Sequence, residues 1–183
     1  AGKTTLLRAL AGFLRIESGS LRVAGGDEEK SLAEQAHVVG HGNAVKTAAR
    51  VIANDAGVAV VHLSIGSFDT HANQAPTQAR LLGDLAQGLA ALESALREIG
   101  RWDRTLVLTY AEFGRRPKEN QSAGTDHGTA SVHFALGGKV AGGFAGEAPR
   151  LERVGDRNLP HAIDFRSVYA TVLERWWSTD ARS

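Results

Sequence analysis

Side chains that can bind a divalent metal ion are concentrated in a few short polar stretches of this 183-residue sequence. Asp69 and His71 follow one apolar run, Glu112 follows a second, and Asp126 and His127 are adjacent further along. Carboxylate oxygens and imidazole nitrogens are ligands that hard and borderline divalent metals take in proteins. We therefore predict a metal site that draws on these five residues. The competing interpretation for each is a loop side chain that caps a helix or bonds to its neighbours.

The elements expected around these stretches bring them to one edge of a sheet. Residues 58–65 and 105–111 are almost continuous apolar runs, typical of strands buried on both faces. Between them, residues 77–99 carry one apolar stripe at helical spacing, and Gly100 is expected to end that helix. A strand–helix–strand unit favours a parallel pair, and ligands of such sheets gather at the carboxyl ends of the strands. The sequence thus predicts an α/β fold, a mainly parallel sheet with flanking helices.

Three further elements are expected outside this unit. Residues 48–54 are predicted as a helix before the first strand, and residues 132–136 as a third strand. Residues 164–177 are predicted as a final amphipathic helix, with Asp164 near its start and in a structural ion pair with Arg166.

Catalytic residues cannot be assigned from the sequence. Ser64, Ser67 and Thr70 carry hydroxyls close to the predicted site, but no pattern marks one of them as an activated nucleophile. Arg115 is a candidate for binding an anion. A solvated basic cluster of Arg115, Arg116 and a nearby lysine is the competing interpretation.

Composition narrows the classes of partner. The formal net charge is +1, which implies no strong attraction to nucleic acid or to an anionic membrane. The chain has no cysteine, so disulfides and thiolate metal sites are excluded. No apolar run approaches the roughly 18 residues that a membrane-spanning helix needs. The start of the sequence also lacks the charged-then-apolar pattern of a signal peptide.

The amino-terminal residues match the end of a phosphate-binding motif. Gly2, Lys3, Thr4 and Thr5 correspond to the last part of a Walker A loop, whose backbone and lysine bind phosphates. The first glycine of that motif and the strand before it are missing. Nucleotide binding by these four residues, with ATP and Mg²⁺, is therefore a secondary prediction. A helix and loop without this activity is the favoured interpretation.

The context of this motif resembles a known ATPase. Residues 1–14, 18–23 and 37–47 resemble the ATP-binding subunit of the haem exporter of cytochrome c maturation, an ABC-type ATPase. Such ATPases need a Leu-Ser-Gly-Gly-Gln signature and a Walker B strand that ends in Asp-Glu. Neither follows in this sequence, so the resemblance implies a remnant of the ATPase.

Residues 48–179 resemble a different family, the domain-of-unknown-function family 1501. Four motifs carry the resemblance, in residues 66–74, 112–116, 124–130 and 164–171. Ser67 departs from the family pattern, because glycine is more common at its position. The resemblance implies a distant relation to alkaline phosphatases and sulfatases, an export signal in the full-length family members, and a bound divalent ion, with Zn²⁺, Mn²⁺, Mg²⁺ and Ca²⁺ all open.

The resemblance also implies roles for single residues. Asp69 and His71 correspond to ligands that follow one core strand, and His127 to a later histidine ligand. Glu112 falls where relatives have an aspartate, and Phe113 replaces the histidine beside it. A rival alignment places Asp126 and His127 in that turn instead; the first alignment is preferred because Glu112 directly ends a strand.

Two segments of different origin are therefore expected, residues 1–47 and residues 48–183. The join near residue 47 suggests a chimera of two gene fragments, because the half that bears the nucleophile in the wider superfamily is replaced by an ATPase-like segment. The predicted function is a fragment of a metal-dependent hydrolase of phosphate or sulfate esters, with a small-molecule ester as substrate. The alternatives are an ATP-binding remnant of the haem exporter and a noncatalytic binding or structural module. Oligomeric state is left open.

Overall fold

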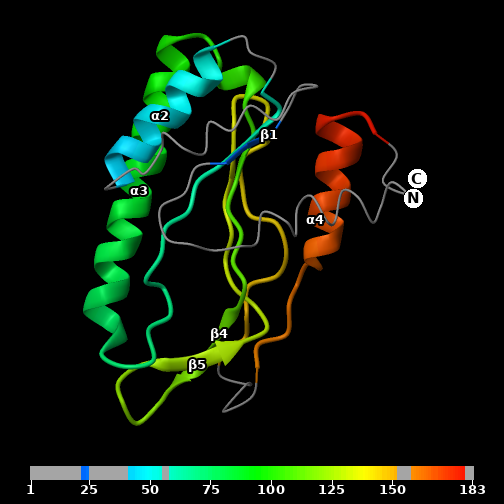
Figure 1. Ribbon diagram of the computed structural model, residues 1–183. Helices are drawn as coiled ribbons and strands as arrows, with labels where there is room; N and C mark the ends of the chain where they lie inside the picture. Colours follow the sequence, from blue (N-terminus) through cyan, green and yellow to red (C-terminus); the bar gives the residue numbers. More distant parts are fainter. Residues whose placement is uncertain (1–21, 25–40, 55–57, 152–157, 180–183) are drawn as a thin grey trace.

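The computed structural model describes residues 22–24, 41–54, 58–151 and 158–179 (Figure 1). The helical elements in this part of the chain are α2 (His41–Ala53), α3 (Gln74–Glu98), the 3-10 turn η2 (Trp102–Arg104), α4 (Phe165–Thr171) and the π-helical turn η4 (Val172–Trp176). The strands are β1 (Arg22–Ala24), β2 (Val60–His62), β3 (Val107–Leu108), β4 (Gly114–Glu119), β5 (Thr125–Gly128) and β6 (Ala135–Leu136).

The described strands form three separate antiparallel pairs, β1 with β2, β3 with β6, and β4 with β5. The predicted order of strand, long helix and strand is present as β2, α3 and β3. These two strands pair with different partners, however, and the described residues include no parallel pair. The mainly parallel sheet stays a prediction.

The long helix α3 organises the packed part of the molecule. It begins at Gln74 and ends at Glu98, close to the predicted limits of 77 and 99. Gly100 follows in a left-handed conformation (φ 66°), and its N–H bonds to the Arg97 carbonyl, so the predicted stop is confirmed. Of the predicted apolar stripe, Leu92 and Leu96 are buried, whereas Leu82 is 51% exposed.

The hydrophobic core lies where α3 meets α2 and the turn that follows α3. Leu92, Leu96 and Trp102 are its buried residues. Partly buried side chains of α2 and of the β3–β6 pair pack against them: Val45, Ala49, Ile52, Val107 and Leu136. Burial of each large apolar side chain contributes about 1.5–3 kcal/mol, so this cluster fixes α2 against α3.

The last helix begins as predicted. Asp164 caps α4, because its carboxylate accepts a hydrogen bond from the Arg166 N–H at 2.9 Å. The same carboxylate forms an ion pair with the Arg166 guanidinium at 2.5 Å, which confirms the expected pair. No helix in the described part of the chain is both long and apolar enough to cross a membrane.

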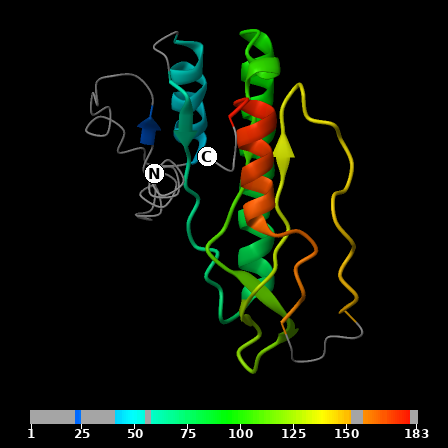
Figure 2. The same cartoon turned by 90° about the vertical axis from the view of Figure 1, so that its right-hand side faces the viewer.

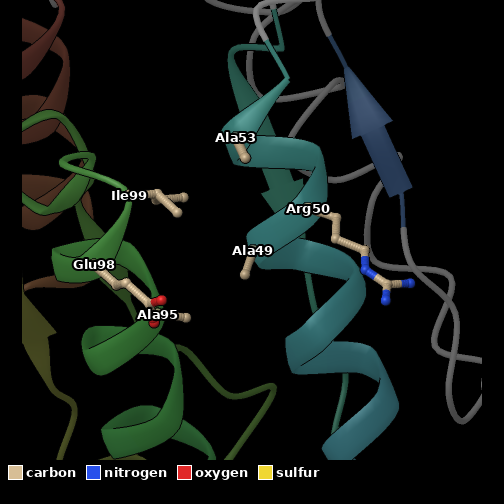
Figure 3. Close-up of a pocket in the computed structure, with 6 residues that line it drawn as sticks. All are labelled: Ala49, Arg50, Ala53, Ala95, Glu98 and Ile99. Atoms are coloured by element: carbon tan, nitrogen blue, oxygen red, sulfur yellow. The ribbon is translucent and has the colours of Figure 1, made fainter.

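A shallow apolar pocket lies in the seam between α2 and α3 (Figure 3). Ala49 and Ala53 come from α2, and Ala95, Glu98 and Ile99 from the end of α3. Because α3 has 25 residues and a helix rises about 1.5 Å per residue, this pocket lies roughly 36 Å from the start of the helix. Figures 1 and 2 show the β4–β5 hairpin at that opposite end. None of the predicted site residues that the structure describes lines the pocket.

Candidate metal centre

A hairpin and a loop bring the predicted ligands together. His127 lies on β5, directly opposite Arg115 on β4. Asp69 and His71 lie in the loop that connects β2 to α3. This loop is tied to the hairpin turn, because the backbone N–H groups of Asn73 and Gln74 donate to carbonyls of the turn at 2.9 and 2.8 Å.

Three side chains converge on one point. Asp69 Oδ1 lies 2.8 Å from His127 Nε2 and 2.9 Å from His71 Nε2. The two imidazole nitrogens lie 3.2 Å apart. Among the described residues, these three form the group whose ligand atoms lie close enough together to hold one ion, all within 4.8 Å of one another.

The three separations fit shared coordination. Ligand atoms bound at 2.0–2.1 Å to one ion lie about 2.9 Å apart in an octahedral shell and about 3.3 Å apart in a tetrahedral one. Distances of 2.8 to 3.2 Å match one triangular face of such a shell. The donor set of two imidazoles and one carboxylate suits Zn²⁺ and other first-row transition metals better than Mg²⁺ or Ca²⁺, which prefer oxygen alone.

The ligand atoms face solvent. The side chains of Asp69, His71 and His127 are 61%, 48% and 46% exposed. Only three protein ligands are provided by the described residues, which leaves further coordination positions open, as in catalytic metal sites. A water molecule or a substrate oxygen therefore has access to an ion held there.

Asp69 is in the form that binds cations. The hydrogen bond from His127 holds the pKa of the Asp69 carboxyl below its ordinary value, while partial desolvation acts in the opposite direction. Electrostatic interactions with the neighbouring His71, His127 and Arg115 side chains lower the pKa of Asp69 further. The carboxylate is therefore ionised at neutral pH.

The loop that carries Asp69 and His71 has a fixed shape. Ser67 adopts a left-handed conformation with φ 71°, which turns the chain out of the strand. Thr70 is buried, and its hydroxyl is bonded by the Gln78 side chain of α3 at 3.1 Å. Since Asp69 and His71 flank Thr70, this anchor directs both of their side chains away from α3 toward the hairpin.

Asn120 is a positioning residue that the sequence did not reveal. Its side-chain amide donates to the His71 carbonyl at 3.0 Å, and its side-chain oxygen accepts from the N–H groups of Ser122 and Gly124. A Cβ atom at Gly124 would overlap the backbone of His71, so only glycine permits this close approach. The signal available in the sequence was the turn-forming composition of residues 120–124.

Arg115 lies inside the site, with its guanidinium 3.6 Å from Asp69 Oδ1. Its Nη1 and Nη2 donate to the backbone carbonyls of Thr125 and Phe68 at 2.5 and 2.6 Å. Both terminal nitrogens therefore already donate to protein oxygens. Anion binding by Arg115 stays a prediction.

The remaining predicted ligands lie outside the triad. Glu112 is exposed and precedes β4, and it does not belong to the group that could hold an ion. Asp126 is exposed on β5, and successive side chains of a strand alternate between its faces, so it points away from the face of His127. Its carboxylate instead lies 3.5 Å from the Asn120 side chain. Gly2, Lys3, Thr4 and Thr5 lie outside the described residues.

A family model described as "Protein of unknown function (DUF1501)" matches residues 13–183. The chain belongs to the DUF1501 family. This confirms the resemblance predicted for residues 48–179 and extends it toward the amino terminus. The wider relation to alkaline phosphatases and sulfatases stays a prediction.

Curated relatives confirm the second resemblance. Over 54 residues the chain is 56% identical to the cytochrome c biogenesis ATP-binding export protein CcmA of Nitrobacter winogradskyi, which covers 30% of this chain and 27% of the relative. CcmA of Nitrobacter hamburgensis is 56% identical over 54 residues, covering 30% and 26%. CcmA of Bradyrhizobium diazoefficiens is 46% identical over the same length, covering 30% and 27%.

The chain thus spans about a quarter of the length of the curated relatives it matches. No solved structure matches it significantly.

Proposed function

We propose that this chain is the metal-binding part of a metal-dependent hydrolase of phosphate or sulfate esters. The observation that carries the proposal is the convergence of Asp69, His71 and His127 from two segments of the chain. Their mutual distances and their open face fit one ion that keeps positions free for a substrate. The resemblance to alkaline phosphatases and sulfatases supplies the ester class, and we propose an incomplete α/β fold of that kind.

Some residues of the site would bind the ion, and others hold the ligands in place. Asp69, His71 and His127 would hold the ion, which when bound supplies charge to stabilise an in-line displacement at phosphorus or sulfur. Asn120 fixes the backbone of His71, and Thr70 fixes the loop between the two ligands. The exposure of the three ligands lets an ester substrate approach from solvent.

Thermal unfolding in the presence of separate ions tests the metal site. At a free ion concentration 100 times the Kd, binding adds about 2.7 kcal/mol, or roughly 5–10 °C in Tm for a chain of this size. We expect this shift with Zn²⁺, Co²⁺ or Mn²⁺ and a smaller one with Mg²⁺ or Ca²⁺. His71→Ala and His127→Ala should abolish it, whereas His161→Ala, an exposed histidine elsewhere, should preserve it. A wild-type chain that no divalent ion stabilises contradicts the site.

Turnover tests the reaction class separately. The metal-loaded chain should release nitrophenolate from p-nitrophenyl phosphate or p-nitrophenyl sulfate, and His127→Ala should lose that activity. Metal binding without turnover of either ester would reduce the proposal to a metal-binding module.

A second candidate function is nucleotide binding, which the identity with the ATP-binding CcmA proteins favours. Lys3 stands where the Walker A lysine contacts phosphates. Isothermal titration with ATP and Mg²⁺ should then give saturable binding that Lys3→Ala abolishes. Equal heats of ATP binding for the wild type and Lys3→Ala would exclude nucleotide binding at this motif.

A further inference from the structure

Arg115 contacts both chain segments that carry the metal ligands. Its Nη2 donates to the Phe68 carbonyl, next to Asp69, and its Nη1 donates to the Thr125 carbonyl, two residues before His127. The guanidinium also lies 3.6 Å from Asp69 Oδ1. The side chain is only 19% exposed, so these contacts are sheltered from competition by water.

Phe113 completes this arrangement on the side of His127. Its ring stacks on the His127 imidazole, with centroids 3.7 Å apart and planes at 11°. The Arg115 guanidinium lies 5.0 Å from the centre of the Phe113 ring, within cation–π range. One ligand ring is therefore held by stacking, and the residue that it stacks on is held by the arginine.

We propose that Arg115 and Phe113 are a positioning pair that aligns Asp69 with His127 before an ion arrives. The proposal rests on the metal site proposed above. Asp69 and His127 are 58 residues apart in sequence, so their alignment has to be imposed by contacts between the segments. Residues that orient metal ligands typically change metal affinity 10- to 100-fold. The planar guanidinium donates to the two carbonyls from two separate nitrogens, whereas a lysine has only one nitrogen with which to reach both.

A positioning role of Arg115 and the repulsion of a cation by its charge predict opposite changes in metal affinity when Arg115 is removed. A positive charge 3.6 Å from a ligand oxygen repels an incoming cation. If charge were its only influence on the site, removing Arg115 would tighten metal binding. A positioning role has the opposite sign, because loss of the two backbone hydrogen bonds lets the ligand segments separate.

The test is the Kd of the full chain for Co²⁺, measured by calorimetry and followed in the visible spectrum of the bound ion. We expect Arg115→Met to bind 10- to 100-fold more weakly and Arg115→Lys to bind more weakly than wild type despite its retained charge. Arg116→Met is the matched control, because it removes the same charge from the exposed neighbour on β4. Its Kd should stay within about twofold of wild type.

Phe113 provides an independent arm. Phe113→Leu should weaken Co²⁺ binding and alter the ligand-field bands of the bound ion. Phe113→Tyr retains a stacking ring, so its Co²⁺ affinity and its ligand-field bands should match those of the wild type. Urea unfolding without metal shows whether each variant is folded during the titration, and this pair keeps the proposal testable if Arg115→Met does not fold.

Folded Arg115→Met that binds Co²⁺ as tightly as wild type or more tightly overturns the proposal, as does equal binding by Phe113→Leu. Failure of the proposed metal site itself would be visible in the wild-type chain, which would then bind no ion.

Discussion

Ser67 is the residue whose backbone sets the direction of the ligand loop. Its φ of 71° lies in the left-handed region, which costs an L-residue roughly 1–2 kcal/mol and a glycine almost nothing. A glycine at this position, which the resemblance to the family leads us to expect, would avoid most of that cost.

We therefore expect Ser67→Gly to raise the free energy of unfolding by about 0.5–1 kcal/mol, after allowance for the greater freedom of glycine in the unfolded chain. Urea denaturation measures the difference. Ser94→Gly makes the same chemical change near the carboxyl-terminal end of α3, where the backbone is helical, and should instead lower stability by about 0.5 kcal/mol. An equal loss of stability in both variants would show that the left-handed conformation is not strained.

At this scale the sequence predicted the ligands better than their support. Residue type indicates Asp69, His71 and His127 as ligands, the first two also by their place after an apolar run, and the structure brings all three together. Asp126 lies outside the group because successive residues of β5 point to opposite faces, so its side chain lies on the face opposite that of His127. This follows only once the segment is known to be a strand. Asn120 acts through backbone atoms of a distant segment, which no local pattern encodes.

The β4–β5 hairpin is the element that the sequence missed. The sequence predicts no strand between residues 112 and 131, because β4 (Gly114–Glu119) holds a proline and four charged residues and lacks the β-branched residues typical of strands. Pairing with β5 overrides these weak preferences, and Gly114 and Gly128 allow backbone approaches that a Cβ would block. The long helix was easier to predict, since apolar spacing and Gly100 define its limits.

The start of α4 yields a prediction about pH. Hydrogen bonds from the Arg166 side chain and backbone hold the pKa of Asp164 well below its usual range. A carboxyl whose pKa is lower in the folded state stabilises the fold above its unfolded pKa, about 3.9, and loses that contribution as pH falls toward the folded value. The difference in unfolding free energy between wild type and Asp164→Asn should therefore be larger at pH 6 than at pH 3.

Asparagine keeps the capping acceptor and removes only the charge, so this variant isolates the ion pair. Asp103→Asn, an exposed carboxylate in η2, controls for the loss of a negative charge elsewhere. A difference for Asp164→Asn that does not change between the two pH values would contradict the assignment.

Over the whole molecule, the sequence predicts where strands lie but not which strands pair. Apolar runs located β2 and β3, but β2 pairs with β1 from the amino-terminal part and β3 with β6 from a later one. Such choices depend on contacts between segments that are distant in sequence, and hydrophobic periodicity carries no information about them. The small core beside α3 leaves large apolar side chains such as Phe144, Val132 and Phe165 exposed on the described surface.

The separation of the ligands along the chain has a consequence for the kinetics of unfolding. His71 and His127 are 56 residues apart, so one ion held by both closes a long loop, and closure of a loop of that length carries an entropy cost of about 3.6 kcal/mol beyond its constant part. In the unfolded chain only Asp69 and His71 are near neighbours, so an ion there gains two ligands at most. A bound metal would therefore act as a reversible cross-link that forms only when the native hairpin is in place. We expect its addition to lower the unfolding rate far more than it raises the folding rate.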